Sequence, residues 1–266
     1  MEKKFKIRCS ALGDFLSGTV GLTDAQKRNL NDLTVKRGVK PLTVLQEETY
    51  QDLLFKQLNP ELPNSVKTYL DKWIKDELLY KKRTQIHSKY TVKGILNESE
   101  NIFYASKHLN WGSVDKNEEE LENEWLTGTP DVRLADEVID IKSSFSHDTF
   151  PLLESECPSK DYICQVRGYM ELDNKSKGSV CYVLSTSPSH LIEREINNES
   201  FNFGYDRDDN EFRQSIIDLY SYDEYPSGLR IKTFNIEKDD AFMDEVKMRV
   251  KLSRKYITEK LKNFIY

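Results

Sequence analysis

The sequence predicts an α/β protein in which a mixed central β-sheet is flanked by helices, with a further helical region at the N-terminal end. Apolar residues recur every three or four positions through much of the first 109 residues, and the spacing changes to every second position between residues 111 and 144. A continuous apolar run then occupies 179–185. These three patterns are typical of amphipathic helices, of half-buried strands and of a strand covered on both faces. Together they favour helices packed against a mixed sheet.

The N-terminal third is predicted to consist of helices. Short helices are expected behind Ser10 and behind Thr23, because hydroxyl side chains commonly cap the first turn of a helix. Thr43 and Gln46 have the spacing of a capping box and predict another helix start. A further helix should follow residues 64–65, where the apolar side chains again repeat at intervals of three and four.

The middle of the chain is predicted to supply the sheet. A helix is expected over 94–109, followed by strands with turns at Asn117 and at Ala135–Asp136, and residues 137–143 alternate strictly between apolar and polar faces. The remaining expected elements are a helix at 160–172, a central strand at 179–185, an acidic turn-rich segment, and helices at 212–220 and 239–263.

The length of 266 residues and the hydrophobic content of 38% favour one large domain. Within a single domain spanning 1–266, we expect a helical N-terminal subregion at 1–90, a core at 91–190 and a C-terminal helical region at 191–266.

Charge is distributed unevenly along the chain. The net charge is −6, but residues 66–93 carry eight Lys and Arg against three acids, and residues 246–262 carry seven against one. Two basic segments of this kind could bind an anionic partner, although a charged run more often forms a solvated face. No apolar run is long enough for a membrane span and no signal peptide is evident, so we expect a cytoplasmic protein without a membrane partner.

Two acids and a lysine form the candidate catalytic motif. Asp131 begins one expected strand, and Asp140-Ile141-Lys142 lies on the next strand after a tight turn. Strand alternation puts Asp140 and Lys142 on one face, and the hairpin brings Asp131 near them. Mg²⁺ prefers oxygen ligands of this type. An isolated motif of this length would more often be an ordinary hairpin with solvated charges.

Glu98 supplies a third acid from the helix at 94–109. It falls within a stripe of apolar residues at three- and four-residue spacing, formed by Ile95, Ile102, Ala105 and Leu109. A carboxylate that faces a core needs a partner, because burial of an unpaired charge is costly. A metal ion shared with Asp131 and Asp140 would be such a partner, and an ion pair between Glu98 and a lysine is the alternative.

Gln165 and Tyr169 are four residues apart in the helix at 160–172 and therefore project from the same side. Both side chains can donate hydrogen bonds to phosphate oxygens. Taken alone, this pair is a weak indication of function.

The ordered set of motifs resembles the PD-(D/E)xK nuclease superfamily, in its RecB-like and phage lambda-type exonuclease branch. The matching motifs, between about residues 90 and 185, are Gly94-xxx-Glu98, Gly128-Thr-Pro130-Asp131, Asp140-Ile-Lys142 and Gln165-xxx-Tyr169. The resemblance implies a restriction-endonuclease-like core. It also implies Mg²⁺, with Mn²⁺ as a substitute, and the spacing of the four cysteines does not match the iron–sulfur members of this branch.

By the same resemblance, Glu98, Asp131, Asp140 and the carbonyl of Ile141 would bind metal, and Lys142 would position or activate the attacking water. Gln165 and Tyr169 would contact the DNA backbone.

The expected function is therefore a Mg²⁺-dependent DNA exonuclease in phage-type recombination or DNA processing. DNA is the expected partner, a single-strand annealing protein and a second copy of the chain being further candidates. Two alternatives stay open: a structure- or sequence-selective endonuclease, and a catalytically silent module that binds DNA or protein on a nuclease scaffold. An enzyme acting on free nucleotides is disfavoured by the absence of a P-loop motif.

Overall fold

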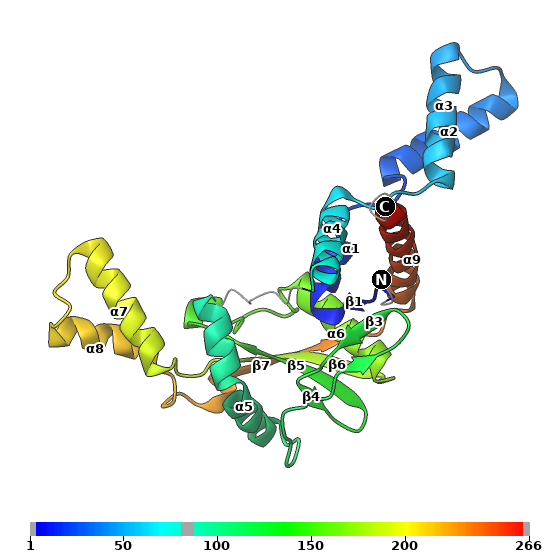
Figure 1. Ribbon diagram of the computed structural model, residues 1–266. Coiled ribbons are helices and arrows are strands. Elements are labelled where there is room, and N and C mark those ends of the chain that lie inside the picture. Colours follow the sequence, from blue (N-terminus) through cyan, green and yellow to red (C-terminus); the bar gives the residue numbers. More distant parts are fainter. Residues whose placement is uncertain (1–3, 81–87, 263–266) are drawn as a thin grey trace. The chain divides into compact units, whose positions relative to one another are not determined.

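A computed structural model describes residues 4–80 and 88–262 of the chain, and its packing divides into two compact units (Figure 1). We call Met1–Ile7, Ala11–Arg83 and Asp240–Tyr266 the helical unit, and Arg8–Ser10 and Thr84–Asp239 the sheet unit. The helical unit contains most of the subregion expected at 1–90, together with the last helix of the chain. The expectation that residues 1–266 form one domain stays a prediction.

The helical unit contains five α-helices in its described part. They are α1 (Leu12–Leu16), α2 (Asp24–Val39), α3 (Val44–Leu58), α4 (Asn64–Leu78) and α9 (Asp240–Lys262). Capping boxes form at Thr23 with Gln26 and at Thr43 with Gln46, where the hydroxyl and amide side chains satisfy backbone N–H groups of the first turn. α4 begins at the expected position, but Pro63 precedes it in place of a hydroxyl or amide cap. The predicted helices of this region are thus all present.

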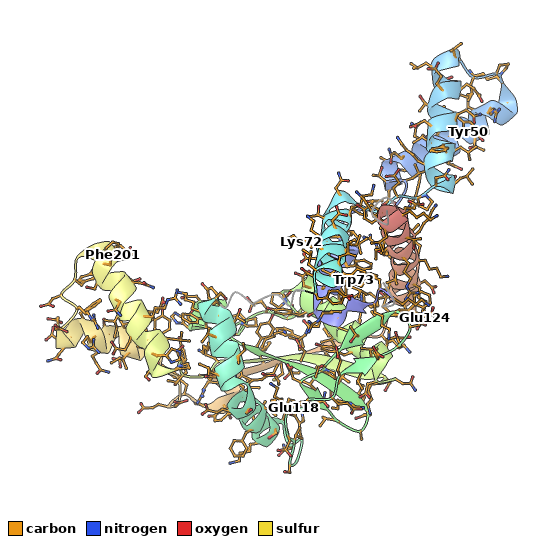
Figure 2. All side chains as sticks on the ribbon, viewed as in Figure 1. Tyr50, Lys72, Trp73, Glu118, Glu124 and Phe201 are labelled. Carbon is orange, nitrogen blue, oxygen red and sulfur yellow. The ribbon has the colours of Figure 1, made fainter. Side chains whose placement is uncertain are left out.

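A buried arginine links two segments of the helical unit. Arg249 of α9 is 1% exposed, and its guanidinium donates hydrogen bonds to the backbone carbonyls of Phe15, Ser17 and Gly18 at 2.6–2.9 Å. Nearby helix α4 contributes Trp73, labelled in Figure 2, whose ring packs edge-on against Phe5 at 5.2 Å. Arg249 therefore ties the chain after α1 to the last helix.

The sheet unit contains the remaining regular elements. Its helices are α5 (Lys89–Leu109), α6 (Lys160–Leu172), α7 (Ser189–Phe203) and α8 (Asn210–Leu219). Its strands are β2 (Leu121–Glu122), β3 (Leu126–Gly128), β4 (Val132–Arg133), β5 (Glu137–Ser143), β6 (Lys177–Val183) and β7 (Ile231–Ile236), while β1 (Ile7–Arg8) lies at its sequence boundary. No helix within residues 4–80 and 88–262 is both long and apolar enough to cross a membrane.

The central sheet is mixed, as predicted. Its strands lie in the order β4-β5-β6-β7, with β5 and β6 parallel and the other two pairs antiparallel. β6 is an interior strand and is buried from Gly178 to Val183, which matches its continuous apolar sequence. The hairpin turn expected at Ala135–Asp136 joins β4 to β5.

Two helices cover opposite faces of the sheet. Ile139 and Ile141 pack in one core cluster with Ile102 and Ala105 of α5. Because side chains alternate along a strand, Val138, Asp140 and Lys142 face the other side. α6 covers that side, since its Gln165 reaches Asp140. The candidate catalytic motif of β5 therefore lies on the face that α6 covers.

The sequence reading of the C-terminal third was wrong in two places. Residues 189–203, expected to lie in an acidic turn-rich segment, form helix α7, whose buried face consists of Leu191, Ile192 and Ile196 together with Glu195. The region from 191 onward was expected to be helical, but it also contributes the edge strand β7. Periodicity did not indicate α7 because charged residues occupy its exposed side. It did not indicate β7 because that strand is short and only half-buried.

The turn expected at Asn117 was also misplaced. The hairpin between β2 and β3 turns at Asn123, whose side-chain oxygen accepts hydrogen bonds from the backbone N–H groups of Trp125 and Leu126. Asn117 instead lies in the loop before this hairpin, where it holds the candidate site as described below.

Gly178 of β6 should not tolerate a side chain. A Cβ atom there would lie 2.5 Å from Val166 and 2.7 Å from Met170, both on α6. We expect Gly178→Ala to lower the free energy of unfolding by about 1–3 kcal/mol, since the strand and helix would have to separate. Urea denaturation measures this, with Gly228→Ala as the control, because a Cβ at Gly228 would meet no atom within 4 Å. Equal midpoints for the two variants would contradict the close packing.

Candidate active site

Asp131 is fixed at the start of β4 by backbone hydrogen bonds. Its Oδ2 accepts a hydrogen bond from the backbone N–H of Ile141 at 2.6 Å, which joins it directly to β5. The N–H of Asn117 donates to the Asp131 carbonyl at 2.8 Å, and the Asn117 side chain donates to the carbonyl of Pro130 at 2.9 Å. Asn117 thus holds the peptide that carries the first acid of the motif.

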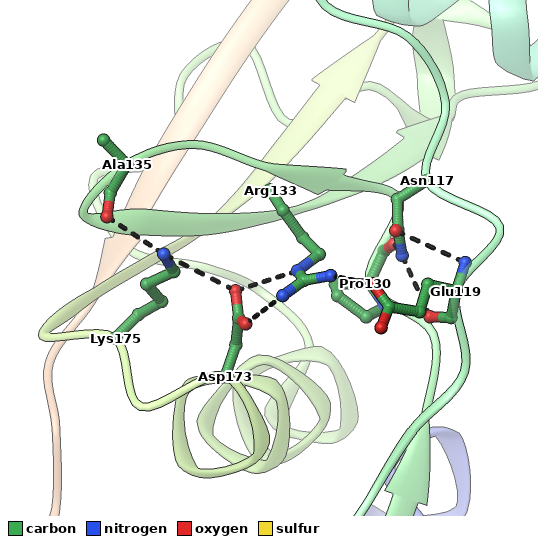
Figure 3. A network of polar contacts seen from close by, with 7 residues as sticks. All are labelled: Asn117, Glu119, Pro130, Arg133, Ala135, Asp173 and Lys175. Atoms are coloured by element: carbon green, nitrogen blue, oxygen red, sulfur yellow. Dashed lines mark hydrogen bonds and ion pairs between the residues drawn. The ribbon is translucent and has the colours of Figure 1, made fainter.

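A polar network supports the same hairpin from the side of α6 (Figure 3). Arg133 of β4 pairs with Asp173, at the end of α6, and with Glu119. Lys175 donates to the carbonyl of Ala135 in the β4–β5 turn at 2.9 Å. Because Arg133 is two residues from Asp131, these ion pairs restrict where the acid can lie.

The buried Asp140 forms an ion pair with the partly exposed Lys142 on β5. Asp140 is 1% exposed, and its Oδ2 lies 2.6 Å from Lys142 Nζ. The Lys142 ammonium lies 4.3 Å from the centre of the Tyr162 ring of α6, within the range of a cation–π contact. Tyr162 was not predicted as a site residue from the sequence, although it precedes Gln165 by three residues and so shares its face of α6.

The two aspartates influence each other's ionisation. Burial raises the pKa of Asp131 well above its usual value, and the nearby Asp140 carboxylate raises this pKa further. Burial also raises the pKa of Asp140, although Lys142 acts in the opposite direction. Burial alone would lower the pKa of Lys142, but the neighbouring Asp140 and Asp131 carboxylates and Tyr162 together outweigh it, and the net shift of the Lys142 pKa is upward. Two neighbouring acids that resist joint ionisation form a site that attracts cations.

Gln165 contacts the site residue Asp140 directly, and Tyr169 contacts Gln165. The Gln165 amide donates to Asp140 Oδ1 at 2.9 Å and to the Tyr169 hydroxyl at 2.8 Å. Tyr169 is 4% exposed, so the DNA contact predicted for it would require its hydroxyl to become accessible. The contacts that the structure does provide orient Asp140.

Glu98 occupies the border of the inner face of α5, not its centre. Its carboxylate accepts a hydrogen bond from Lys116 at 2.8 Å, which is the lysine pairing left open as the alternative. Ile95, expected in the buried stripe, is 52% exposed, whereas Asn97 and Asn101 are buried. The buried face of α5 is therefore more polar than its sequence suggested. The Glu98 charge still acts on both aspartates, since it contributes to raising the pKa of each.

Lys93, on the buried face of α5, was missed in the sequence. It is fully buried, and its ammonium donates to the carbonyls of Phe145 at 3.0 Å and Ser185 at 2.6 Å. Phe145 follows β5 and Ser185 follows β6, so Lys93 joins the helix that carries Glu98 to the ends of both central strands. A lone lysine in a sequence gives no signal of burial, because most lysines are exposed.

The burial of Lys93 should make stability depend on pH. Burial lowers the pKa of Lys93 to about 7, whereas the unfolded chain has the ordinary lysine value near 10.4. Between these values the unfolded state binds more protons, so the free energy of unfolding should rise with pH by up to about 1.4 kcal/mol per pH unit. We expect denaturation midpoints between pH 7 and 10 to show this rise in the wild type and to lack it in Lys93→Met. Parallel pH profiles would contradict it.

The sequence-predicted acids and lysine line one cavity of about 510 Å³, which also includes Ile141, Gln165 and Tyr162. A set of three carboxylates suits a hard divalent cation. Their present arrangement does not complete a metal site, because in the described chain no group of three such side chains is close enough to hold an ion. Lys116 and Lys142 neutralise Glu98 and Asp140 instead.

Comparison with known proteins identifies the fold through similar solved structures. No family model matches the chain, and no curated protein matches its sequence. A phage-related exonuclease from Haemophilus somnus 129PT superposes with a TM-score of 0.69 at 23% identity, covering 98% of this chain and 97% of that one. An alkaline exonuclease from Laribacter hongkongensis gives 0.56 at 12% identity, covering 97% and 91%, and its complex with dAMP gives 0.56 at 13%. The predicted restriction-endonuclease-like fold is confirmed.

Proposed function

We propose that this protein is a divalent-metal-dependent deoxyribonuclease that hydrolyses phosphodiester bonds from DNA ends. The observation that carries the proposal is the convergence of Glu98, Asp131, Asp140 and Lys142 on one cavity, with charges that act on one another. The three acids, from a helix and a hairpin, match the ligand set that metal-dependent phosphodiester hydrolysis needs. The lysine matches the general acid–base or electrostatic group of that reaction.

The structural neighbours support the choice of substrate and the preference for ends. Both are exonucleases by name, one is phage-related, and one has been seen with the mononucleotide dAMP. Their folds match nearly the full length of this chain. A role in phage-type recombination, with a single-strand annealing protein as partner, is part of the proposal and rests on this likeness alone.

Each group of the site has a role that its contacts support. Mg²⁺ held by Glu98, Asp131 and Asp140 would supply the Lewis-acid charge that polarises the phosphate. Lys142, held by Asp140 and Tyr162, presents a positive charge toward the cavity in which negative charge develops on the phosphoryl oxygens. Gln165 fixes the Asp140 carboxylate, and Asn117 fixes the backbone of Asp131. The Ile141 carbonyl is proposed as a further metal ligand.

The direct test follows DNA labelled at the 5′ or at the 3′ end, together with closed-circular DNA of the same sequence, with Mg²⁺ or with EDTA. We expect mononucleotides to be released from linear DNA with Mg²⁺ but not with EDTA. Circular DNA should persist under both conditions. Loss of circular DNA at a comparable rate would replace the exonuclease with an endonuclease. If salt-sensitive DNA binding occurs without turnover under Mg²⁺ or Mn²⁺, the chain is a silent binding module.

A further inference from the structure

One face of α5 turns toward the candidate active site at three positions. Tyr90, Gly94 and Glu98 follow one another at intervals of four residues and therefore lie on the same side of the helix. All three line the cavity that contains Asp131 and Asp140. At 1.5 Å per residue, the strip from Tyr90 to Glu98 extends over about 12 Å, which is long enough for a phosphate, its sugar and its base.

Gly94 leaves the middle of this strip open. A Cβ atom built at Gly94 would meet no other atom within 4 Å, so no neighbouring part of the described chain needs the space. Glycine inside a helix costs about 1 kcal/mol relative to alanine. Gly94 therefore gains nothing from packing within the protein, in contrast to Gly178, where a Cβ would collide with α6. The free space beside Gly94 belongs to the cavity that Gly94 lines.

Tyr90 presents an exposed but supported aromatic ring at the end of the strip. Tyr90 is 55% exposed, yet its ring meets the buried Phe145 ring at 5.2 Å in an edge-on arrangement. Phe145 is held in turn by the Tyr220 ring at 5.2 Å and by the Lys89 ammonium at 4.7 Å. The Lys89 ammonium also lies 5.5 Å from the centre of the Tyr90 ring. A ring that is held by its neighbours and is still more than half exposed loses little entropy when a flat ligand stacks on it.

We propose that Tyr90 and Gly94 form a nucleobase subsite of this cavity, a step that rests on the proposed function. The base of the nucleotide next to the scissile phosphate stacks on Tyr90, and its sugar passes over Gly94 while the phosphate reaches the acids near Glu98. Every base has a π-face, so this subsite accepts all four bases without reading sequence. The helix that supplies the third acid thus also positions the strand end.

The first test measures the dissociation constants of two duplex oligonucleotides in EDTA, by fluorescence anisotropy. One duplex has intact terminal nucleotides, and the other has abasic sites at the last two positions of each strand. Tyr90→Ala should weaken binding of the intact duplex by roughly 10- to 100-fold and change binding of the abasic duplex little. Tyr90→Trp should retain the preference for intact ends. Phe103→Ala is the matched control, because Phe103 is also on α5 and is 56% exposed, but does not line the cavity.

The second test uses the open space beside Gly94. Gly94→Ala should raise the melting temperature, because alanine favours the helix, and still weaken binding of the intact duplex, because the methyl group occupies the path of the sugar. Gly38→Ala in α2 is the control: its Cβ also meets no atom within 4 Å, and it should leave DNA affinity unchanged. A merely structural role of Gly94 would not combine greater stability with weaker binding.

The outcomes separate the two proposals. If the wild type degrades linear DNA but Tyr90→Ala keeps the wild-type preference for intact ends, the subsite is wrong and the nuclease stands. If no metal ion supports cleavage but Tyr90→Ala abolishes that preference, the subsite stands and the proposed function fails. Equal affinity of the wild type for intact and abasic duplexes would also overturn the subsite.

Discussion

Replacement of Asp140 by asparagine should reduce DNA cleavage by about 10²- to 10³-fold while the protein stays folded. Asparagine keeps the shape of the side chain and an oxygen that can accept the hydrogen bond from Gln165, but it removes the charge that attracts a cation and holds Lys142. It also removes a negative charge from beside Asp131, whose pKa Asp140 raises. We expect an effect of similar size for Lys142→Ala, from the loss of positive charge where the phosphoryl oxygens become more negative.

Initial rates on end-labelled linear DNA with Mg²⁺ would measure this loss, and circular dichroism melting would show that the fold is kept. Asp136→Asn is the matched control, because Asp136 lies in the turn of the same hairpin and its exposed carboxylate pairs only with Lys177 among the ion pairs observed in the described chain. Asp136→Asn should cleave at the wild-type rate. If Asp140→Asn also did so, the cavity would not be the catalytic site.

Replacement of Arg249 by methionine should lower the free energy of unfolding by about 3 kcal/mol or more. The Arg249 guanidinium donates to three backbone carbonyls between Phe15 and Gly18. Methionine fills part of the volume but donates no hydrogen bond, and a buried polar group left without a partner costs about 1–3 kcal/mol. A lysine at this position would also satisfy these carbonyls less well, because it lacks the planar fork of arginine.

Chemical denaturation would measure the loss of stability as a lower midpoint at unchanged slope. Lys255→Met provides the control on the same helix, since Lys255 is exposed and its replacement should change stability by no more than about 0.5 kcal/mol. Arg249→Lys should fall between the wild type and Arg249→Met. A midpoint for Arg249→Met that equals the wild-type value would mean that these hydrogen bonds add no net stability.

The sequence by itself determined many of the local elements and selected the candidate site residues, which line one cavity. Capping boxes at Thr23 and Thr43 are formed by side chains three residues apart, so the signal is complete in the sequence. The bounds of α6, the β4–β5 turn and the interior position of β6 follow equally from local patterns of polarity. The carboxylates and Lys142 could be selected because strand alternation and a short hairpin leave few other ways to bring acids together.

Only the tertiary structure decided which partners these charges have. Glu98 pairs with Lys116 and Gln165 donates to Asp140, contacts that span 18 and 25 residues. Helical periodicity gives the side of a helix on which a residue lies but not what covers that side, so the buried Lys93 and the exposed Ile95 were both misjudged. A buried lysine is stable here because two strand ends present carbonyls to it, and sheet pairing over long sequence separations places those carbonyls.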